Sequence, residues 1–230
     1  MSRILLKLSG EALADKERHY DDAVITGIAE QVKKLLKNGD EIGIVIGGGN
    51  YWRGRSSKNI DRTKADQIGM LATVMNCIYV SEIFRTEGID TRIMTPFACS
   101  SFTELFSKDK AIRNMKKNRV VFFAGGTGHP YFSTDTGVVL RAVEVEADAI
   151  YLAKSIDGVY SADPAKDKNA KKYKEISIQE VIDKNLQVVD MTASILARDN
   201  KMPMKVFDLT EKDSIIKAMG KDFSGTTITV

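Results

Sequence analysis

Residues 124–135 read Ala-Gly-Gly-Thr-Gly-His-Pro-Tyr-Phe-Ser-Thr-Asp, and this stretch decides how the fold is interpreted. It follows the apolar run 120–123, which is typical of a buried strand, and precedes a helical pattern over 136–142. A glycine-rich turn therefore leaves a strand end and presents backbone N–H groups, hydroxyls and the Asp135 carboxylate. Ligands of open α/β sheets bind at such strand ends, and helix N-termini favour anions. The stretch predicts a site for a small phosphorylated molecule.

The composition bounds the class of protein. The chain has 230 residues, of which 43% are hydrophobic and 28% are charged, enough for one sizeable core. We expect a single domain over residues 1–230. No apolar run approaches the roughly 18 residues of a membrane-spanning helix, and the first apolar stretch is too short for a signal peptide. We therefore expect a cytoplasmic protein with no membrane contact.

Charge and thiol patterns exclude two further classes of site. The net charge is +3, and the basic run 166–174 is interrupted by other residues. It favours a solvated face over a nucleic-acid patch, so no nucleic-acid partner is expected. Cys77 and Cys99 lack paired spacing and indicate lone thiols in a reducing compartment. Together with His19 and His129 they do not form a zinc pattern, and no metal-ligating residues are predicted.

Strand and helix patterns alternate along the chain. The predicted strands are 4–8, 41–46, 90–94, 120–123, 148–153, 205–207 and 226–230. The predicted helices run from an Asp21 or Asp22 cap to Gly39, over 63–86 and 108–117, from Asp135 to about 146, from a Ser177–Glu180 capping box to 184, over 192–200, and from a Thr210 cap to 219. Residues 154–175 are loop-rich. This alternation predicts an α/β fold with a mostly parallel sheet covered on both faces.

The helix expected over 63–86 has two apolar stripes. One comprises Ile68, Leu71, Ala72, Met75 and Tyr79, and the other comprises Met70, Val74, Cys77 and Ile78. A helix that is apolar on two sides is either internal or covered on one side by another subunit.

Three more loops leave strand ends. Lys7-Leu8-Ser9-Gly10 ends the first strand, where the lysine could reach a phosphate, and an edge lysine with a turn is the alternative. Gly47-Gly48-Gly49 ends the second, followed by Arg53, which could clamp a phosphate; a flexible turn is the alternative. Residues 157–164 follow the fifth strand and combine turn signals with an aromatic ring and carboxylates, though alone they fit an ordinary surface turn.

These loops together indicate phosphoryl transfer between two bound molecules. Such transfer needs alignment and positive charge over the migrating group more than covalent chemistry. The chain contains neither a Gly-x-x-x-x-Gly-Lys-Ser/Thr loop nor a Gly-x-Gly-x-x-Gly fingerprint, so it would not bind nucleotides in those two common ways.

In this order, the segments resemble the amino acid kinase superfamily and, within it, the bacterial UMP kinases. The resemblance covers almost the whole chain and rests on segments 7–13, 45–50 with 53–54, 69–76, 127–135, 141–148, 159–164 and 196–199. The first two are shared by several superfamily kinases, whereas Thr-Gly-His-Pro-Tyr-Phe-Ser-Thr-Asp is much closer to UMP kinases alone.

The resemblance implies an α/β/α sandwich that transfers the ATP γ-phosphoryl group to UMP, giving UDP and ADP in pyrimidine nucleotide biosynthesis. It implies catalytic roles for Lys7, Asp135 and Arg53. The implied ATP-binding residues are Lys7, Leu8, Ser9, Gly10, Gly49, Arg53, Lys154, Tyr160 and Asp163, the last three at the adenosine end. The implied UMP-binding residues are Gly48, Asp66 (on the ribose), Thr127, Gly128, His129, Pro130, Tyr131, Phe132, Ser133 and Thr134. The acceptor side would then lie mainly in 1–150 and the ATP side mainly in 151–230.

The resemblance also implies Mg²⁺ held mainly through ATP phosphates, a homohexamer built from dimers through helix 63–86, and feedback inhibition by UTP. The sequence departs from the family pattern at residues 14–21. In many members this loop carries glycines and contributes to GTP activation, but here it is charged and lacks glycine, so GTP activation is not implied.

Two alternatives stay open. One is a superfamily kinase for another acceptor, such as glutamate, aspartate, carbamate or acetylglutamate, although the length disfavours aspartate kinases, which usually carry an extra regulatory domain. The other is a nucleotide-binding regulator that keeps the fold without transfer, which the presence of Lys7, Arg53 and Asp135 disfavours.

Overall fold

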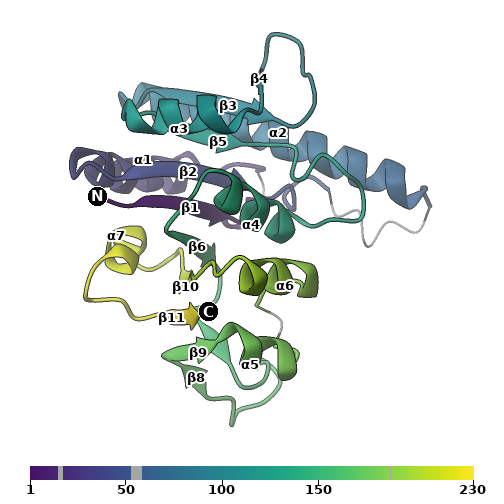
Figure 1. Cartoon of the computed structure of the whole chain (residues 1–230), viewed down its shortest axis with the longest axis vertical. Helices are drawn as coiled ribbons and strands as arrows, with labels where there is room; N and C mark the ends of the chain where they lie inside the picture. Colours follow the sequence, from purple (N-terminus) through teal and green to yellow (C-terminus); the bar gives the residue numbers. More distant parts are fainter. Residues whose placement is uncertain (15–17, 53–58, 187) are drawn as a thin grey trace.

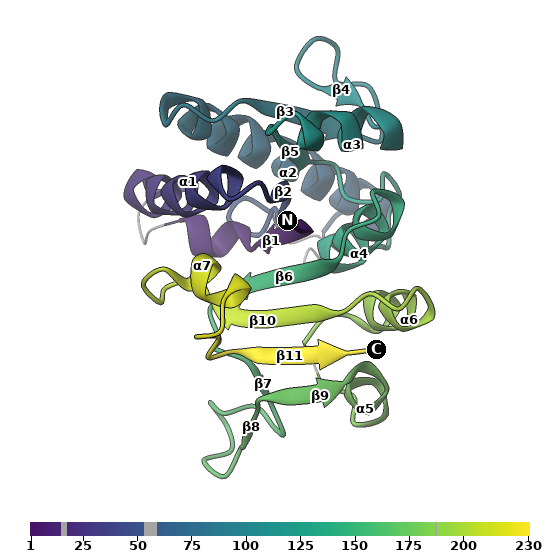
Figure 2. The same ribbon diagram turned by 60° about the vertical axis from the view of Figure 1, so that its left-hand side comes forward.

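Strand β1 (Arg3–Leu8) lies inside a twisted, mostly parallel sheet (Figures 1 and 2). The computed structural model describes residues 1–14, 18–52, 59–186 and 188–230; Arg53 and part of the 14–21 loop lie outside them. Within the described residues the sheet has the order β4-β3-β5-β2-β1-β6-β10-β11-β9, and only the β10–β11 pair is antiparallel. The other strands of this sheet are β2 (Glu41–Ile46), β3 (Thr91–Thr95), β4 (Glu104–Leu105), β5 (Val120–Phe123), β6 (Ala149–Lys154), β9 (Glu175–Ser177), β10 (Met204–Asp208) and β11 (Thr226–Thr229). The predicted α/β class is confirmed.

Helices cover both faces of the sheet, as Figures 1 and 2 show. They are α1 (Asp22–Lys37), α2 (Arg62–Thr86), α3 (Lys108–Lys116), α4 (Thr134–Glu144), α5 (Ile178–Asp183), α6 (Met191–Asp199) and α7 (Ser214–Met219), with a short 3₁₀ turn at Gly10–Leu13. Helix α1 starts where predicted, because the Asp21 carboxylate accepts from the N–H groups of Ala23 and Val24 at 3.0 and 3.2 Å. It is followed by Gly39 at φ 88°, the left-handed geometry that favours glycine after a helix.

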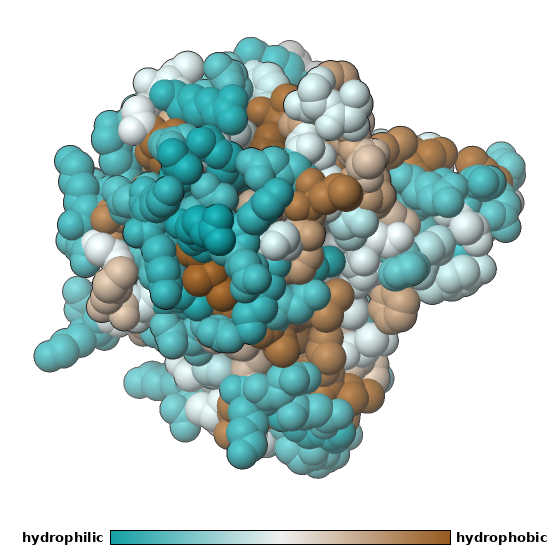
Figure 3. Space-filling view, turned by 45° about the horizontal axis from the view of Figure 1, so that its top comes forward, coloured by the Kyte–Doolittle hydropathy of each residue, from teal (hydrophilic) through white to brown (hydrophobic). Residues whose placement is uncertain are grey.

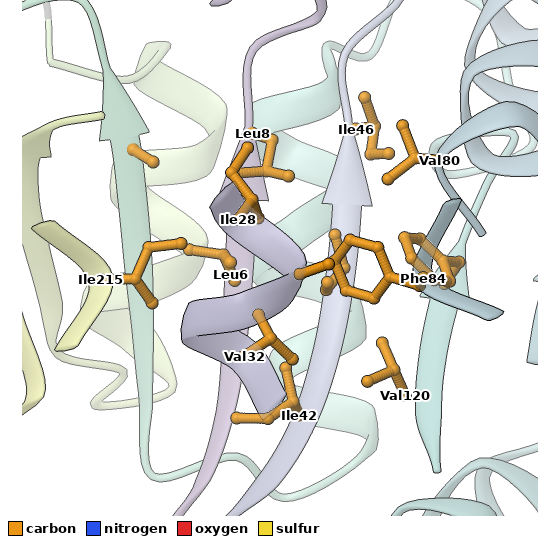
Figure 4. Packing of buried hydrophobic residues seen from close by; sticks show 14 of the residues in the cluster. Leu6, Leu8, Ile28, Val32, Ile42, Ile46, Val80, Phe84, Val120 and Ile215 are labelled. Carbon is orange, nitrogen blue, oxygen red and sulfur yellow. The ribbon is translucent and has the colours of Figure 1, made fainter. Parts of the chain in front are cut away.

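Two hydrophobic cores lie on opposite faces of the sheet. One joins β1 and β2 to α1, α2 and α7, and Figure 4 shows Val32, Phe84 and Ile215 of this cluster converging on the strands. Phe84 meets Phe122 edge-on at 5.3 Å between ring centroids. The second core lies under α3, α4, α5 and α6. Strands buried on both faces explain why their sequences are continuous apolar runs rather than alternating patterns.

The buried face of α2 follows neither predicted stripe as a whole. Ala72 of the first stripe is buried together with Val74 and Cys77 of the second. Ile68, Leu71, Met75 and Tyr79 of the first stripe remain exposed in the single chain, as does Ile78 of the second. Burial raises the pKa of the Cys77 thiol, so it stays protonated. By length and composition alone α2 would be long and apolar enough to cross a membrane, but its most apolar window is 44% buried inside the fold.

Several sequence expectations need correction. Thr210 does not cap the last helix: its hydroxyl and N–H both bond to Asp208 Oδ1 at 2.8 Å, and α7 starts only at Ser214, after Asp213 at φ 55°. A side chain that satisfies a local turn cannot also cap a helix four residues later. The loop-rich stretch 154–175 contains a small hairpin, β7 (Val159–Tyr160) with β8 (Lys172–Tyr173), and the short strands β4 and β9 were missed. Ser177 does cap α5 by accepting from Glu180 N at 3.1 Å, while the Glu180 carboxylate pairs with Lys184.

The winding of the chain changes direction between β1 and β6. From β1 the chain adds β2, β3 and β5 on one side, and then α4 crosses the sheet to β6 on the other side. In open α/β sheets the crevice beyond the carboxyl ends of the strands at such a point is where ligands bind. Lys7 and Lys154 stand near the carboxyl ends of these two strands.

Candidate active site

An ion pair lies at the switch point. Lys7 Nζ on β1 is 2.7 Å from Asp135 Oδ1 in the first turn of α4, and both side chains are largely buried. The helix begins there because Ser133 accepts from the N–H groups of Asp135 and Thr136 at 3.0 and 3.1 Å. The N-terminal end of α4 therefore aims its dipole at the same place as the lysine. This arrangement favours a negatively charged ligand.

A cavity of about 270 Å³ opens beside this ion pair. It is lined by Lys7, Ser9, Gly10, Glu11, Gly47, Gly48, Gly49, Trp52, Arg62, Asp66, Gly69, Met70, Thr73, Gly126, Thr127, His129, Phe132, Ser133 and Thr134. Residues expected on the ATP phosphate side (Lys7, Ser9, Gly10, Gly49) thus share one cavity with residues expected on the UMP side (Gly48, Asp66, Thr127). The lining is the mixture of glycine backbone, hydroxyls and a cation that phosphate groups favour.

The glycine loop of this cavity is held by a buried amide. Asn76 of α2 is fully buried and donates to Gly47 O at 2.7 Å, while its Oδ1 accepts from Tyr20 at 2.9 Å. The glycine loop packs tightly on α2, because a Cβ on Gly48 would lie 3.0 Å from Ala72 Cβ and from Gly69 O and would push them back by a few tenths of an ångström. At Gly10 a Cβ would lie 2.4 Å from Gly47 O. The loop is therefore fixed against α2 before any ligand binds.

The 124–135 turn is tied to α2 as well. Gly125 N donates to Thr73 Oγ1 at 2.8 Å, and Gly125, Gly126 and Gly128 have φ between 58° and 85°. Tyr131, at φ 71°, donates its N–H to Asp66 Oδ2 at 2.8 Å, and that oxygen also accepts from Arg62 at 2.8 Å. Asp66 therefore shapes the turn itself in addition to facing the cavity.

Several predicted residues do not line this cavity, among them Asp135, which reaches it through its ion pair with Lys7. The Leu8 side chain is buried in the first core and its carbonyl accepts from Gly47 N at 2.9 Å, while Gly128, Pro130 and Tyr131 lie in the turn outside the lining. Arg53 lies outside the described residues.

A second cavity, of about 540 Å³, lies on the β6 side of the switch point. Its lining is Lys154, Ile156, Gly158, Val159, Tyr160, Ser161, Ala162, Asp163, Pro164, Lys166, Lys184, Asn185, Leu186, Val188 and Val206. It includes the three residues expected at the adenosine end. Tyr160 donates to Asp157 Oδ1 at 2.8 Å, which raises the tyrosine pKa, and Asp163 Oδ1 accepts from Ala165 N at 3.0 Å in a tight turn.

Lys154 lines the second cavity, and charged groups near the Lys7–Asp135 pair act on it. Its ammonium donates to the Val188 carbonyl, and burial lowers its pKa, an effect that nearby Asp135 and Asp190 oppose and Lys7 reinforces. Lys154 lines the second cavity from the end of β6, the strand paired with the β1 strand that carries Lys7.

Sequence reasoning missed Asp190. Its carboxylate accepts from the hydroxyls of Ser133 and Thr136 and from Ala193 N, so it caps α6 and connects α6 to the start of α4. The signal was available, since an aspartate directly before a helical pattern is a typical N-cap. Asn76, Thr73 and Trp52 were also missed, because nothing in a helical pattern marks which of its polar residues will face a distant loop.

Comparison with known proteins agrees with this geometry. Residues 2–208 match the sequence profile of the Amino acid kinase family. The fold is similar to that of UMP kinase from Bacillus anthracis, with a TM-score of 0.94 and 35% identity over 99% of this chain and 96% of that one. It is similar to UMP kinase from Ureaplasma parvum, with a TM-score of 0.95 and 32% identity over 100% and 99% of the two chains. Uridylate kinase from Archaeoglobus fulgidus, at 24% identity over the full length of both chains and a TM-score of 0.75, shares the fold.

Proposed function

Because this chain belongs to the amino acid kinase family, we propose that it transfers the γ-phosphoryl group of ATP to UMP, giving UDP and ADP in pyrimidine nucleotide biosynthesis. The observation that carries the proposal is the Lys7–Asp135 ion pair, 2.7 Å between Nζ and Oδ1, at the switch point: Lys7 on β1 lines one cavity, and Lys154 on the neighbouring strand β6 lines the other. One cavity would hold the acceptor and the other the donor nucleotide, so the reacting phosphates would meet at Lys7.

The acceptor would occupy the cavity beside the glycine loop. Gly48 and residues 127–134 would surround UMP, and Asp66 would bond the ribose hydroxyls. Since Asp66 Oδ2 already accepts from Tyr131 N and Arg62, the ribose would use Oδ1. The Ser133 hydroxyl already caps α4 and donates to Asp190, so Ser133 would contribute chiefly by fixing the helix N-terminus.

The donor would place its phosphates along Lys7, Ser9, Gly10 and Gly49, with Arg53 added from outside the described residues. Tyr160 and Asp163 would hold the adenosine in the second cavity. The acceptor side would belong mainly to residues 1–150 and the ATP side mainly to 151–230, with the Lys7–Gly10 and Gly49 loops shared between them.

Mg²⁺ fits this site as a partner of the nucleotide. Among the described residues there is no cluster of three or more His, Cys, Asp or Glu side chains that could hold a metal. Mg²⁺ needs only one or two carboxylates when phosphates supply other ligands, and Asp135 is placed to be such a carboxylate. Asp135 would hold it beside the nucleotide, where it would offset the negative charge of the phosphates.

We further propose that the chain forms a homohexamer built from dimers, with α2 as the dimer contact. Figure 3 shows apolar side chains interrupting a mostly hydrophilic surface, and the exposed apolar residues of α2 include Leu71 at 53% and Met75 at 45% exposure. The double variant Leu71→Lys, Met75→Lys should have a lower mass by light scattering. The control Lys37→Met, at an exposed position of α1, should not. An unchanged mass would reject this contact.

The experiment that tests the function is UDP formation from ATP and UMP, run with glutamate, aspartate, carbamate and acetylglutamate as competing acceptors. UDP formed in preference to any other product supports the proposal, and phosphorylation of an amino acid in preference to UMP rejects it. Binding of both nucleotides without UDP would favour a regulator. The same assay with added UTP and GTP tests two further proposals. UTP should inhibit, and GTP should not activate, because the 14–21 sequence lacks the glycines of the family's GTP-linked loop. Fractionation of cells would test the proposed cytoplasmic location.

A further inference from the structure

Lys154 points to the same side of the sheet as Lys7. Lys7 is in register with Leu152 on the neighbouring parallel strand, so these two side chains share a face. Lys154 stands two residues beyond Leu152 on β6 and therefore points to that face too. Leu152 packs in the core under α4 and α6. The two lysines are thus diagonal neighbours at the carboxyl ends of the two strands that flank the switch point.

Four charged groups meet above this pair of strands. Lys7 comes from β1, Lys154 from β6, Asp135 from the first turn of α4, and Asp190 from the residue before α6. Asp135 is paired with Lys7 at 2.7 Å. Asp190 accepts hydrogen bonds from the hydroxyls of Ser133 and Thr136. Both carboxylates are therefore held in place by other partners.

The Lys154 ammonium is held without being neutralised. It donates to the Val188 carbonyl, and among residues 1–14, 18–52, 59–186 and 188–230 no carboxylate lies within ion-pairing distance of it. A neutral carbonyl fixes the position of the lysine, and Asp135 and Asp190 offset its charge only through longer-range attraction. A buried cation in that state gains most when an anion arrives beside it.

The proposed reaction brings two anionic phosphates together. An oxygen of the UMP phosphate attacks the γ-phosphorus, the bond to the β–γ bridging oxygen breaks, and ADP leaves with that electron pair. No proton is lost or gained when both phosphates are fully ionised. Because Asp135 offsets part of the Lys7 charge at 2.7 Å, a second cation beside the migrating group would stabilise the negative charge of the transition state.

Resting on the proposed function, we propose that Lys154 is a catalytic residue that contacts the migrating phosphoryl group beside Lys7, rather than a residue of the adenosine pocket. Tyr160 and Asp163 line the same cavity, on β7 of the β7–β8 hairpin and in the turn that follows β7. Lys154 lines that cavity from the end of β6, on the face of the sheet that it shares with Lys7.

The test compares Lys154→Met with a control, Lys110→Met. Lys110 is exposed on α3 and is not among the lining residues of either cavity. For Lys154→Met we expect kcat for UDP formation to fall about 100-fold or more, with ADP affinity within about threefold of wild type. Lys110→Met should stay within about twofold in both. A parallel loss of ADP affinity with an unchanged kcat would return Lys154 to the adenosine pocket and overturn the proposal.

A second measurement does not depend on turnover. Aluminium fluoride mimics the migrating phosphoryl group and should tighten ADP binding to the wild-type protein in the presence of UMP. In Lys154→Met that gain should disappear while ADP alone still binds, which also shows that the variant is folded; Lys154→Arg should restore part of it. An equal gain in Lys154→Met would overturn the role of Lys154. Failure of the wild-type protein to form UDP would instead overturn only the acceptor assignment.

Discussion

The cavity beside the glycine loop and the cavity beside the β7–β8 hairpin differ in what holds their walls. The first is fastened to α2 by buried polar groups: Asn76 bonds Gly47 O at 2.7 Å and Thr73 bonds Gly125 N at 2.8 Å. The second has one such bond, from Val159 N to Thr226 Oγ1 at 2.8 Å, and otherwise half-exposed contacts within its own loop, such as Lys172 with Asp157 at 2.7 Å. Buried hydrogen bonds left unmade are costly, whereas exposed ion pairs contribute little. The walls of the first cavity are therefore held more firmly than those of the second.

The largest effect is expected where the two regions meet. Lys7→Met and Asp135→Asn should each lower kcat by about 100-fold or more, because each removes a charge beside the migrating group. The double variant should be little worse than either single variant, since the two side chains act as one pair. Steady-state kinetics measure this. Asp109→Asn is the control, because Asp109 occupies the first turn of α3 but is exposed. Near-normal turnover in Lys7→Met would contradict the assigned site.

The next effect tests whether the first cavity is rigid. Gly10→Ala places a Cβ 2.4 Å from Gly47 O and 2.5 Å from Asn50 Oδ1, so a backbone must shift. We expect a loss of about 1–3 kcal/mol in the free energy of unfolding and a raised KM for UMP. Gly27→Ala is the control, since its Cβ would meet nothing within 4 Å on α1, and it should be neutral or stabilising. If urea unfolding does not separate the two variants, the loop is not tightly fixed.

Asn76→Ala sharpens the same comparison. It removes the donor to Gly47 O and leaves that buried carbonyl without its partner, so unfolding should become easier by about 1–3 kcal/mol. The KM for UMP should rise more than the KM for ATP, because the bond supports the first cavity. Asn200→Ala, at an exposed helix end, is the control. Equal changes in both KM values would mean that α2 supports the whole site and not one side of it.

The smallest effect is expected in the second region. Lys172→Met should cost less than about 1 kcal/mol near neutral pH, because the pair with Asp157 is partly exposed. Hydrogen bonding to Lys172 lowers the pKa of Asp157, so its contribution is present above the ordinary carboxyl range and is lost as pH falls through it. Thermal melts at pH 7 and pH 3 should therefore show a small difference that shrinks at the lower pH. A large, pH-independent loss would show that the hairpin is as rigid as the first cavity.

Much of the fold was predictable because its signals are local. The N-cap at Asp21, the glycine after α1 and the apolar strands at 41–46 and 120–123 all lie where the pattern indicates them. Errors came where a polar side chain had two possible hydrogen-bond partners. Thr210 carries the same hydroxyl as a helix cap, yet Asp208 is nearer and takes it. Very short strands such as β4 and β9 carry no period that a pattern could reveal.

The sequence by itself determined that the strand-end loops carry a lysine, glycines and Asp135, because glycine-rich turns after apolar strands are readable residue by residue. Only the tertiary structure decided which loops share a cavity. It brought Asp66 to Tyr131 N across 65 positions, placed Asn76 under Gly47, and put Lys154 at the end of the strand next to that of Lys7. The reason is that strand order and register, which no local pattern encodes, decide which strand ends become neighbours.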